Sequence, residues 1–206
     1  MGCERQSHRP GHPGKRSPVT KTIVDAAVGM TYPQLGANWQ VSRDGWTEAD
    51  ALDDGLTTRQ EALVQTACIE DVSGAIRVGD LSAVVASGSL PWAVWYRGPA
   101  DLEYAAKGYF RVLEPMNYDA PAYTKHELSS KPHEVSGKKA WLYKLVLELD
   151  AAAVEAQGWS WRKETVMIVL VDRGAKKRPG ILFISMPDSH QNLGDIDLVL
   201  GSIKAR

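Results

Sequence analysis

The chain is poor in cysteine and in long apolar runs. Its 206 residues include two cysteines, Cys3 and Cys68, which excludes a framework of several disulfides and leaves the redox compartment open. The longest wholly apolar stretch, Val166 to Val171, has the length of a strand, and no run approaches the 18 or so apolar residues of a membrane span. Cys68 has no nearby Cys or His and is expected to be a small buried hydrophobic residue.

Motifs for nucleotide, metal and nucleophilic chemistry are also missing. The sequence has no G-x-G-x-x-G or Walker loop and no G-x-S-x-G elbow. His8 and His12 lie in a Pro/Gly-rich segment, and Asp50, Asp53 and Asp54 lack the register of a calcium loop, so no metal site and no cofactor are predicted. His126, His133 and His190 are the histidines that a hydrolase with an unrecognised Ser/His/Asp set would use, and that alternative stays open.

Positive charge is concentrated at the N-terminus. Residues 1–22 carry five basic side chains and one acidic one, whereas the remainder has an excess of acidic residues, which argues against a nucleic-acid-binding face. The same 22 residues contain three prolines, three glycines and few apolar side chains. We therefore expect a disordered basic tail at 1–22 and a single domain at 23–206.

The start of the tail offers a clue to location. Gly2-Cys3 followed by a Ser/Pro/Gly/His-rich stretch resembles the junction of a bacterial lipoprotein, in which a lipid-modified cysteine precedes a flexible tether. This interpretation makes Cys3 a lipidation site and requires a signal segment upstream of Met1. A chance pair of residues is the alternative. The protein is then extracytoplasmic if its N-terminus is truncated, and cytoplasmic otherwise.

Hydrophobic periodicity predicts an α+β fold. Leu102, Ala105, Ala106, Tyr109, Phe110 and Leu113 form the apolar stripe of a helix over 99–114 that Pro115 ends. Four antiparallel strands follow as a meander over 122–186, with Tyr123–Val135 at an edge, and Thr165–Val171, apolar on both faces, covered on both sides. Asp188 and Gln191 are expected to cap a final helix over 190–203. The whole is predicted to be a three-layer α/β/α sandwich.

The order of these elements resembles the family of the photosystem II extrinsic protein PsbP and the Ran-binding protein Mog. The residues that carry the resemblance include Met30-Thr31-Tyr32-Pro33 with Trp39, the turn from Ser136 to Trp141, Glu164 to Gly174, and Leu200 to Ile203. The resemblance spans about residues 25–206. It implies a binding or accessory module without catalysis, with bacterial relatives that include lipoprotein-type or membrane-tethered actinobacterial domains. No functional residue of the family maps onto this chain.

Tryptophan is unusually frequent, with seven against two phenylalanines. Because tryptophan is enriched at recognition surfaces, we predict that some aromatic residues line a groove, drawn from Trp92, Trp95, Tyr96, Trp159 and Trp161. Packing in the core and at its rim is the alternative. The cluster Lys176-Lys177-Arg178 is expected either to keep a hairpin tip soluble or to contact an anion or a lipid headgroup.

Three hypotheses for function follow. The first is a non-enzymatic binding or scaffold domain, extracytoplasmic and tethered to the cell envelope through its N-terminus. The second is a cytoplasmic partner-binding regulator of the Mog type, and the third is the hydrolase described above. The ligand, an unknown protein or small molecule, and the oligomeric state are not defined by the sequence.

Overall fold

A computed structural model describes residues 9–41, 54–70, 76–118 and 122–206. Its main element is a seven-stranded sheet in the order β3-β4-β5-β9-β8-β7-β6, in which every neighbouring pair is antiparallel. The strands are β3 (Trp39–Val41), β4 (Leu56–Glu70), β5 (Ile76–Ser89), β6 (Tyr123–Val135), β7 (Lys138–Leu149), β8 (Lys163–Val171) and β9 (Gly180–Pro187). The predicted α+β class and the four-strand meander from β6 to β9 are confirmed, with β6 at an edge.

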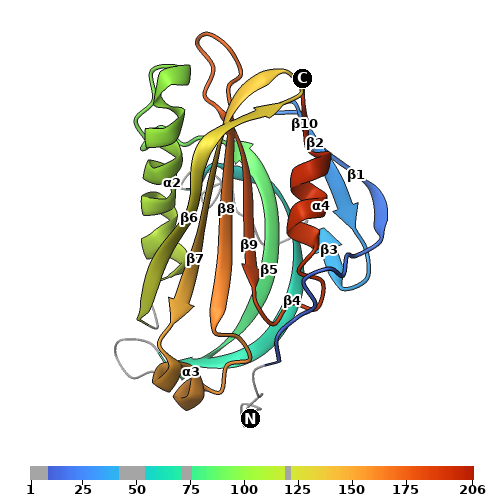
Figure 1. Cartoon of the computed structure of the whole chain (residues 1–206), viewed down its shortest axis with the longest axis vertical. Coiled ribbons are helices and arrows are strands. Elements are labelled where there is room, and N and C mark those ends of the chain that lie inside the picture. The colour runs from blue at the N-terminus through green and yellow to red at the C-terminus, as the bar shows by residue number, and fades with distance from the viewer. Residues whose placement is uncertain (1–8, 42–53, 71–75, 119–121) are drawn as a thin grey trace.

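One face of this sheet is covered by α2 (Leu102–Asn117), which follows a 3₁₀ turn, η1 (Pro99–Asp101) (Figure 1). All six residues of the predicted apolar stripe are buried, in a core shared with Val166, Ile168 and Leu170 of β8. The predicted end at Pro115 is wrong, because the helix continues to Asn117. Proline removes a single N–H there, and the Tyr118 N–H donates to the Glu114 carbonyl and closes the last turn.

The other face carries α4 (Asp195–Ser202) and a small sheet in the order β1-β2-β10 (Figure 1). Its strands are β1 (Val19–Asp25), β2 (Met30–Leu35) and β10 (Lys204–Ala205). Met167, Val169 and Val171 of β8 are buried in the core on this side, so β8 is covered on both faces as predicted. Helix α3 (Ala151–Gln157) links β7 to β8, and its N-cap is Asp150, whose carboxylate accepts the Ala153 N–H.

The N-terminal segment is ordered earlier than the sequence suggests. Strand β1 begins at Val19, Ser17 is buried, and the N–H groups of Gly11 and His12 donate to the carbonyls of Asp188 and Gln191. The predicted disorder of residues 1–22 is therefore wrong from Gly11 onward. The segment has few apolar side chains to bury, and hydrogen bonds to a distant part of the chain order it instead. Residues 1–8, with Cys3 and His8, lie outside the described residues, as do Asp50 and Asp53.

The final helix starts later than predicted. It begins at Asp195 with Gly194 as its N-cap, and the carboxylate of Asp188 instead accepts the Arg162 N–H at 3.0 Å. Residues 188–194 form a connection whose backbone is bonded to the N-terminal segment, including the Gly194 N–H to the Lys15 carbonyl at 2.9 Å. These contacts compete with helix formation, so the predicted capping box at Asp188 and Gln191 does not form.

Candidate functional site

The five aromatic residues of the predicted groove lie in two separate groups. Trp159 and Trp161 are stacked with ring centroids 4.6 Å apart and are 5% and 4% exposed, in a small core cluster with Ala67 and Val154. These two residues therefore pack as core side chains, and their assignment to a binding groove is wrong. Val154 belongs to α3, which lies at the opposite end of the molecule from the connection between β8 and β9 (Figure 1).

Trp92, Trp95 and Tyr96 belong to an irregular segment, residues 90–98, between β5 and η1. Trp92 is 85% exposed and Trp95 is 48% exposed, which is rare for side chains of this size. Trp95 meets the ring of Tyr104 edge-on at 5.6 Å, and the Arg97 guanidinium lies 5.4 Å from the Trp95 ring centroid. The rings are thus positioned by neighbours while a large apolar area remains open to solvent.

Arg178 holds this segment in place. Its guanidinium donates to the backbone carbonyls of four residues, Leu90, Pro91, Val94 and Tyr96. The same group lies 5.0 Å from the Trp92 ring centroid and 5.6 Å from that of Tyr96, distances typical of cation–π contacts. Arg178 is therefore a structural clamp and not merely a charge that keeps a hairpin tip soluble.

Tyr96 also forms a hydrogen bond with the connection between β8 and β9, which contains Arg178. Its hydroxyl donates to Asp172 Oδ1 at 3.2 Å. Burial and the Asp172 carboxylate both raise the pKa of Tyr96 above its usual value, so the phenol remains a neutral hydrogen-bond donor throughout the physiological range.

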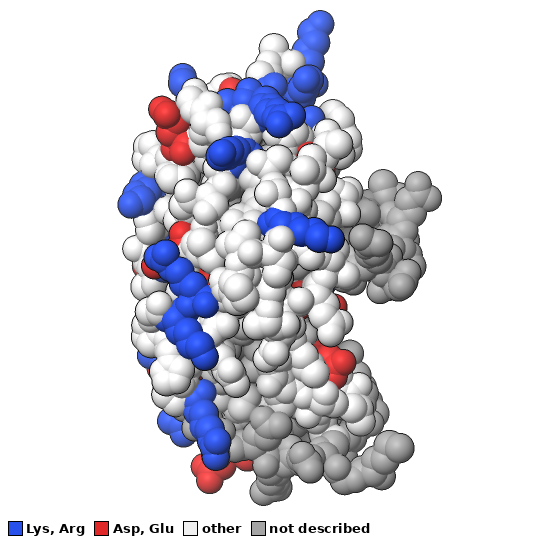
Figure 2. Space-filling model, turned by 90° about the vertical axis from the view of Figure 1, so that its right-hand side faces the viewer, with Lys and Arg blue, Asp and Glu red and all other residues white. Residues whose placement is uncertain are grey.

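Between this segment and the β8–β9 connection lies a cavity of about 440 Å³. Its walls include Trp92, Tyr96, Arg97, Asp172, Lys176 and Lys177 together with Arg178, so four basic side chains face one acidic one. We call these seven residues the aromatic–basic surface. The β8–β9 connection is at the top in Figure 1, and basic side chains also gather at the top of the face shown in Figure 2.

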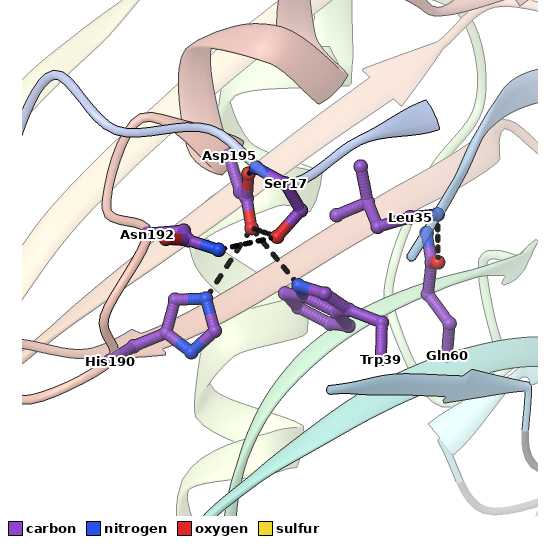
Figure 3. A network of polar contacts seen from close by, with 7 residues as sticks. All are labelled: Ser17, Leu35, Trp39, Gln60, His190, Asn192 and Asp195. Atoms are coloured by element: carbon purple, nitrogen blue, oxygen red, sulfur yellow. Dashed lines mark hydrogen bonds and ion pairs between the residues drawn. The ribbon is translucent and has the colours of Figure 1, made fainter. Parts of the chain in front are cut away.

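A second polar cluster tests the hydrolase alternative (Figure 3). Asp195 Oδ2 accepts hydrogen bonds from Ser17 Oγ at 2.7 Å and Trp39 Nε1 at 2.9 Å, and it lies 3.3 Å from His190 Nε2. A nucleophilic serine needs a histidine as its base, with the carboxylate behind the histidine. Here the carboxylate lies between Ser17 and His190, and Ser17 is 4% exposed. The cluster joins the N-terminal segment, β3 and α4, and its geometry fits a structural role and not that of a catalytic triad.

The other residues considered for catalysis, metal binding or disulfide chemistry lie apart from this cluster. His126 Nε2 lies 3.3 Å from Glu148 Oε2 on the exposed side of the β6–β7 pair. Within the described ranges, no group of three or more His, Cys, Asp or Glu side chains could hold a metal ion. Cys68 is half-buried and disulfide-bonded, so the prediction of a small buried hydrophobic residue is wrong. No helix in the part of the chain that the structure describes is long and apolar enough to cross a membrane.

No family model matches the sequence, and no curated protein does. The structure is similar to the solution structure of cyanobacterial PsbP (CyanoP) from Synechocystis sp. PCC 6803, with a TM-score of 0.49 and 9% identity over 90% of this chain and 92% of that one. The Saccharomyces cerevisiae Ran-binding protein Mog1p is similar with a TM-score of 0.47 and 8% identity over 91% of this chain and 96% of that one. A point mutant of the protein Mog1 has a TM-score of 0.46 and 8% identity over 90% of this chain and 95% of that one.

The expected likeness to PsbP and Mog is thus found as a similarity in overall structure at very low identity. None of the three proteins is described as a lipoprotein or as actinobacterial. At these values no residue role and no partner passes from them to this chain, and the aromatic–basic surface has to be interpreted from its own geometry.

Proposed function

We propose that this chain is a non-enzymatic binding domain and that its aromatic–basic surface recognises an acidic segment of a partner protein. The observation that carries the proposal is the exposed Trp92 ring, held by the Arg178 clamp beside a cavity with an excess of positive charge. Exposed aromatic rings on a fixed backbone supply apolar contact with little loss of conformational entropy, and clustered basic groups select for anionic side chains.

The shape of the surface favours a protein segment over a lipid bilayer. A bilayer is met by protruding apolar and basic side chains, whereas here the basic groups line a hollow between two segments of chain. An extended peptide with one apolar residue among acidic ones can place that residue against Trp92 and its carboxylates near Lys176 and Lys177. The occupant that we propose is therefore an acidic peptide segment.

Binding to an acidic peptide tests this proposal. A fluorescein-labelled dodecapeptide of Asp and Glu with one central Phe is expected to bind, and Trp92→Ala or the double variant Lys176→Glu/Lys177→Glu should weaken binding about tenfold or more. Fluorescence anisotropy at two salt concentrations measures the affinity. The double variant Lys15→Glu/Lys21→Glu, which changes the same charge at other exposed lysines, serves as the control.

Two results would contradict the proposal. One is equal weakening by the control and by the Lys176/Lys177 variant, which would indicate attraction to overall charge alone. The other is binding to phosphatidylglycerol vesicles, lost in Trp92→Ala, with no affinity for the peptide, which would make the surface a membrane contact.

We also propose that the domain works outside the cytoplasm, tethered through its N-terminus. The disulfide of Cys68 supports this, because disulfides persist in oxidising compartments and are rare in the cytosol. The chain contains only two cysteines, so a lipid on Cys3 would leave Cys68 without a partner within the same chain. The Cys68 disulfide therefore argues against a lipid on Cys3, and a cytoplasmic regulator of the Mog type remains the competing hypothesis.

Alkylation before and after reduction separates these locations. We expect Cys68 from cells lysed in iodoacetamide to be protected until dithiothreitol is added, as shown by mass spectrometry of its tryptic peptide. Full alkylation without reductant, together with recovery of the protein in the cytosolic fraction, would reject the extracytoplasmic proposal. A diacylglycerol adduct on the Cys3 peptide would instead establish the lipid tether.

A further inference from the structure

A second cavity opens on the face of the large sheet that α2 covers only in part. Helix α2 contacts β6, β7 and β8, and the cavity, of about 440 Å³, lies beyond its C-terminal end toward β4 and β5. Leu56, Val84, Leu113 and Phe183 form apolar walls. Both the volume and the combination of apolar walls with polar groups are typical of small-molecule sites.

Glu164 lies at this cavity and is the one acidic residue of β8. Its Oε1 atom accepts hydrogen bonds from the hydroxyls of Tyr118 at 2.9 Å and Ser185. Within the described part of the chain, no hydrogen bond reaches Oε2. One oxygen is therefore fixed by the protein, and the other is left for a ligand.

The charge around the cavity is negative. Asp54, Glu61, Asp80 and Glu164 contribute carboxyl groups, and Arg59, the single basic residue of the lining, lies 3.1 Å from Glu61. Burial raises the pKa of Glu164 and outweighs the hydroxyls of Ser185 and Tyr118, which lower it. Nearby ionisable groups on the packed elements are Tyr118 and Glu114 at the end of α2 and Tyr123 and Lys125 on β6, and Lys125 is paired with Glu114. Among the described residues, the carboxylate form of Glu164 therefore has no cation of its own.

We propose that this cavity binds a small organic ammonium ion with an apolar body, whose charged group pairs with Oε2 of Glu164. An ammonium supplies both the missing hydrogen-bond donor and the missing positive charge, and the apolar walls receive its carbon chain. A carboxylate ligand would meet the four carboxyl groups of the lining, and a neutral alcohol would leave the charge uncompensated. The cavity is separate from the aromatic–basic surface, so this inference does not rest on the proposed function.

Three probes of nearly equal shape distinguish these cases: hexylammonium, hexanol and hexanoate. Titration of the intact protein followed by two-dimensional NMR of its backbone amides is expected to shift Tyr118, Glu164 and Ser185 with hexylammonium, about tenfold more tightly than with hexanol, and not with hexanoate. The variant Glu164→Gln should weaken hexylammonium binding about tenfold while leaving hexanol unchanged.

Glutamine keeps an oxygen for the hydroxyls of Tyr118 and Ser185, so Glu164→Gln is expected to fold, which its amide spectrum will show directly. Glu148→Gln is the matched control because it removes one exposed carboxylate from the neighbouring strand β7. Equal affinity for hexylammonium and hexanol, binding of hexanoate, or equal weakening by the two Gln variants would each overturn the proposal. None of these results depends on whether the acidic peptide binds.

Discussion

Replacing Asp195 with alanine is expected to lower the free energy of unfolding by roughly 3–5 kcal/mol, because it leaves several buried donors without an acceptor. The Asp195 side chain is 0% exposed, and it accepts hydrogen bonds from the Ser17 N–H at 2.6 Å, from the Ser17 hydroxyl and from the Trp39 indole. His190 lies beside it, 5.4 Å from the Trp39 ring. The carboxylate thereby joins three segments that are far apart in the sequence (Figure 3).

Asp197 provides a control in the same turn of α4. Both aspartates lie in the first turn and interact in the same way with the helix dipole, but Asp197 is exposed. Asp197→Ala is expected to change stability by less than about 1 kcal/mol in urea denaturation. If the two variants differ by less than about 1 kcal/mol, the network does not hold the termini together. The Trp39 indole N–H resonance should shift in Asp195→Ala alone.

The same network predicts a dependence on acid. Burial alone would raise the pKa of Asp195, but the bonds from His190, Ser17 and Trp39 together lower it below its ordinary value of 3.8. A carboxyl whose pKa is depressed by folding contributes stability above its unfolded pKa and loses it as the pH falls through the folded value. The stability difference between wild type and Asp195→Ala should therefore narrow below pH 3.8 and stay constant above about pH 5.

Elements with strong hydrophobic periodicity could be predicted from the sequence. The stripe of α2 and the two-sided apolar pattern of β8 depend on side chains a few residues apart, and both are confirmed. The N-terminal segment and the start of α4 could not be predicted in the same way. Ser17 and Asp195 are 178 residues apart. The composition of the N-terminal segment predicts disorder because it does not reveal that the hydrogen-bond partners of the segment lie at the other end of the chain.

The candidate sites show the same division. Trp92 and Trp95 are exposed, whereas Trp159 and Trp161 pack in the core, and a binding role for the exposed pair stays a prediction. Arg178 lay in a charge cluster, and nothing in the sequence revealed the four carbonyls that converge on it, because loop geometry positions them. Glu164 is visible in the sequence as the single acidic residue of β8, two positions before the apolar run from Val166 to Val171, and a charge count over the whole chain obscures it.

Arg178→Ala is expected to destabilise the protein by about 2–3 kcal/mol and to loosen residues 90–98 selectively. The guanidinium is half-buried and its fork of N–H groups satisfies four carbonyls, which the single nitrogen of an ammonium cannot reach together. Arg178→Lys should therefore recover only a minor part of the loss. Lys177→Ala removes the same charge from the neighbouring exposed side chain and should leave stability within about 0.5 kcal/mol of wild type.

Hydrogen exchange locates the effect. In Arg178→Ala, the amides of Leu90 and Val94, which donate to Pro179 and Pro91 respectively, should exchange faster while those of α2 and β8 keep their protection. Trp92 then loses its fixed position, and affinity for the acidic peptide should fall in Arg178→Ala more than the loss of one charge in Lys177→Ala explains. Equal exchange in the two variants would show that the segment holds its shape without the clamp. Peptide affinity would then depend on the charge of this surface and not on the placement of its aromatic rings.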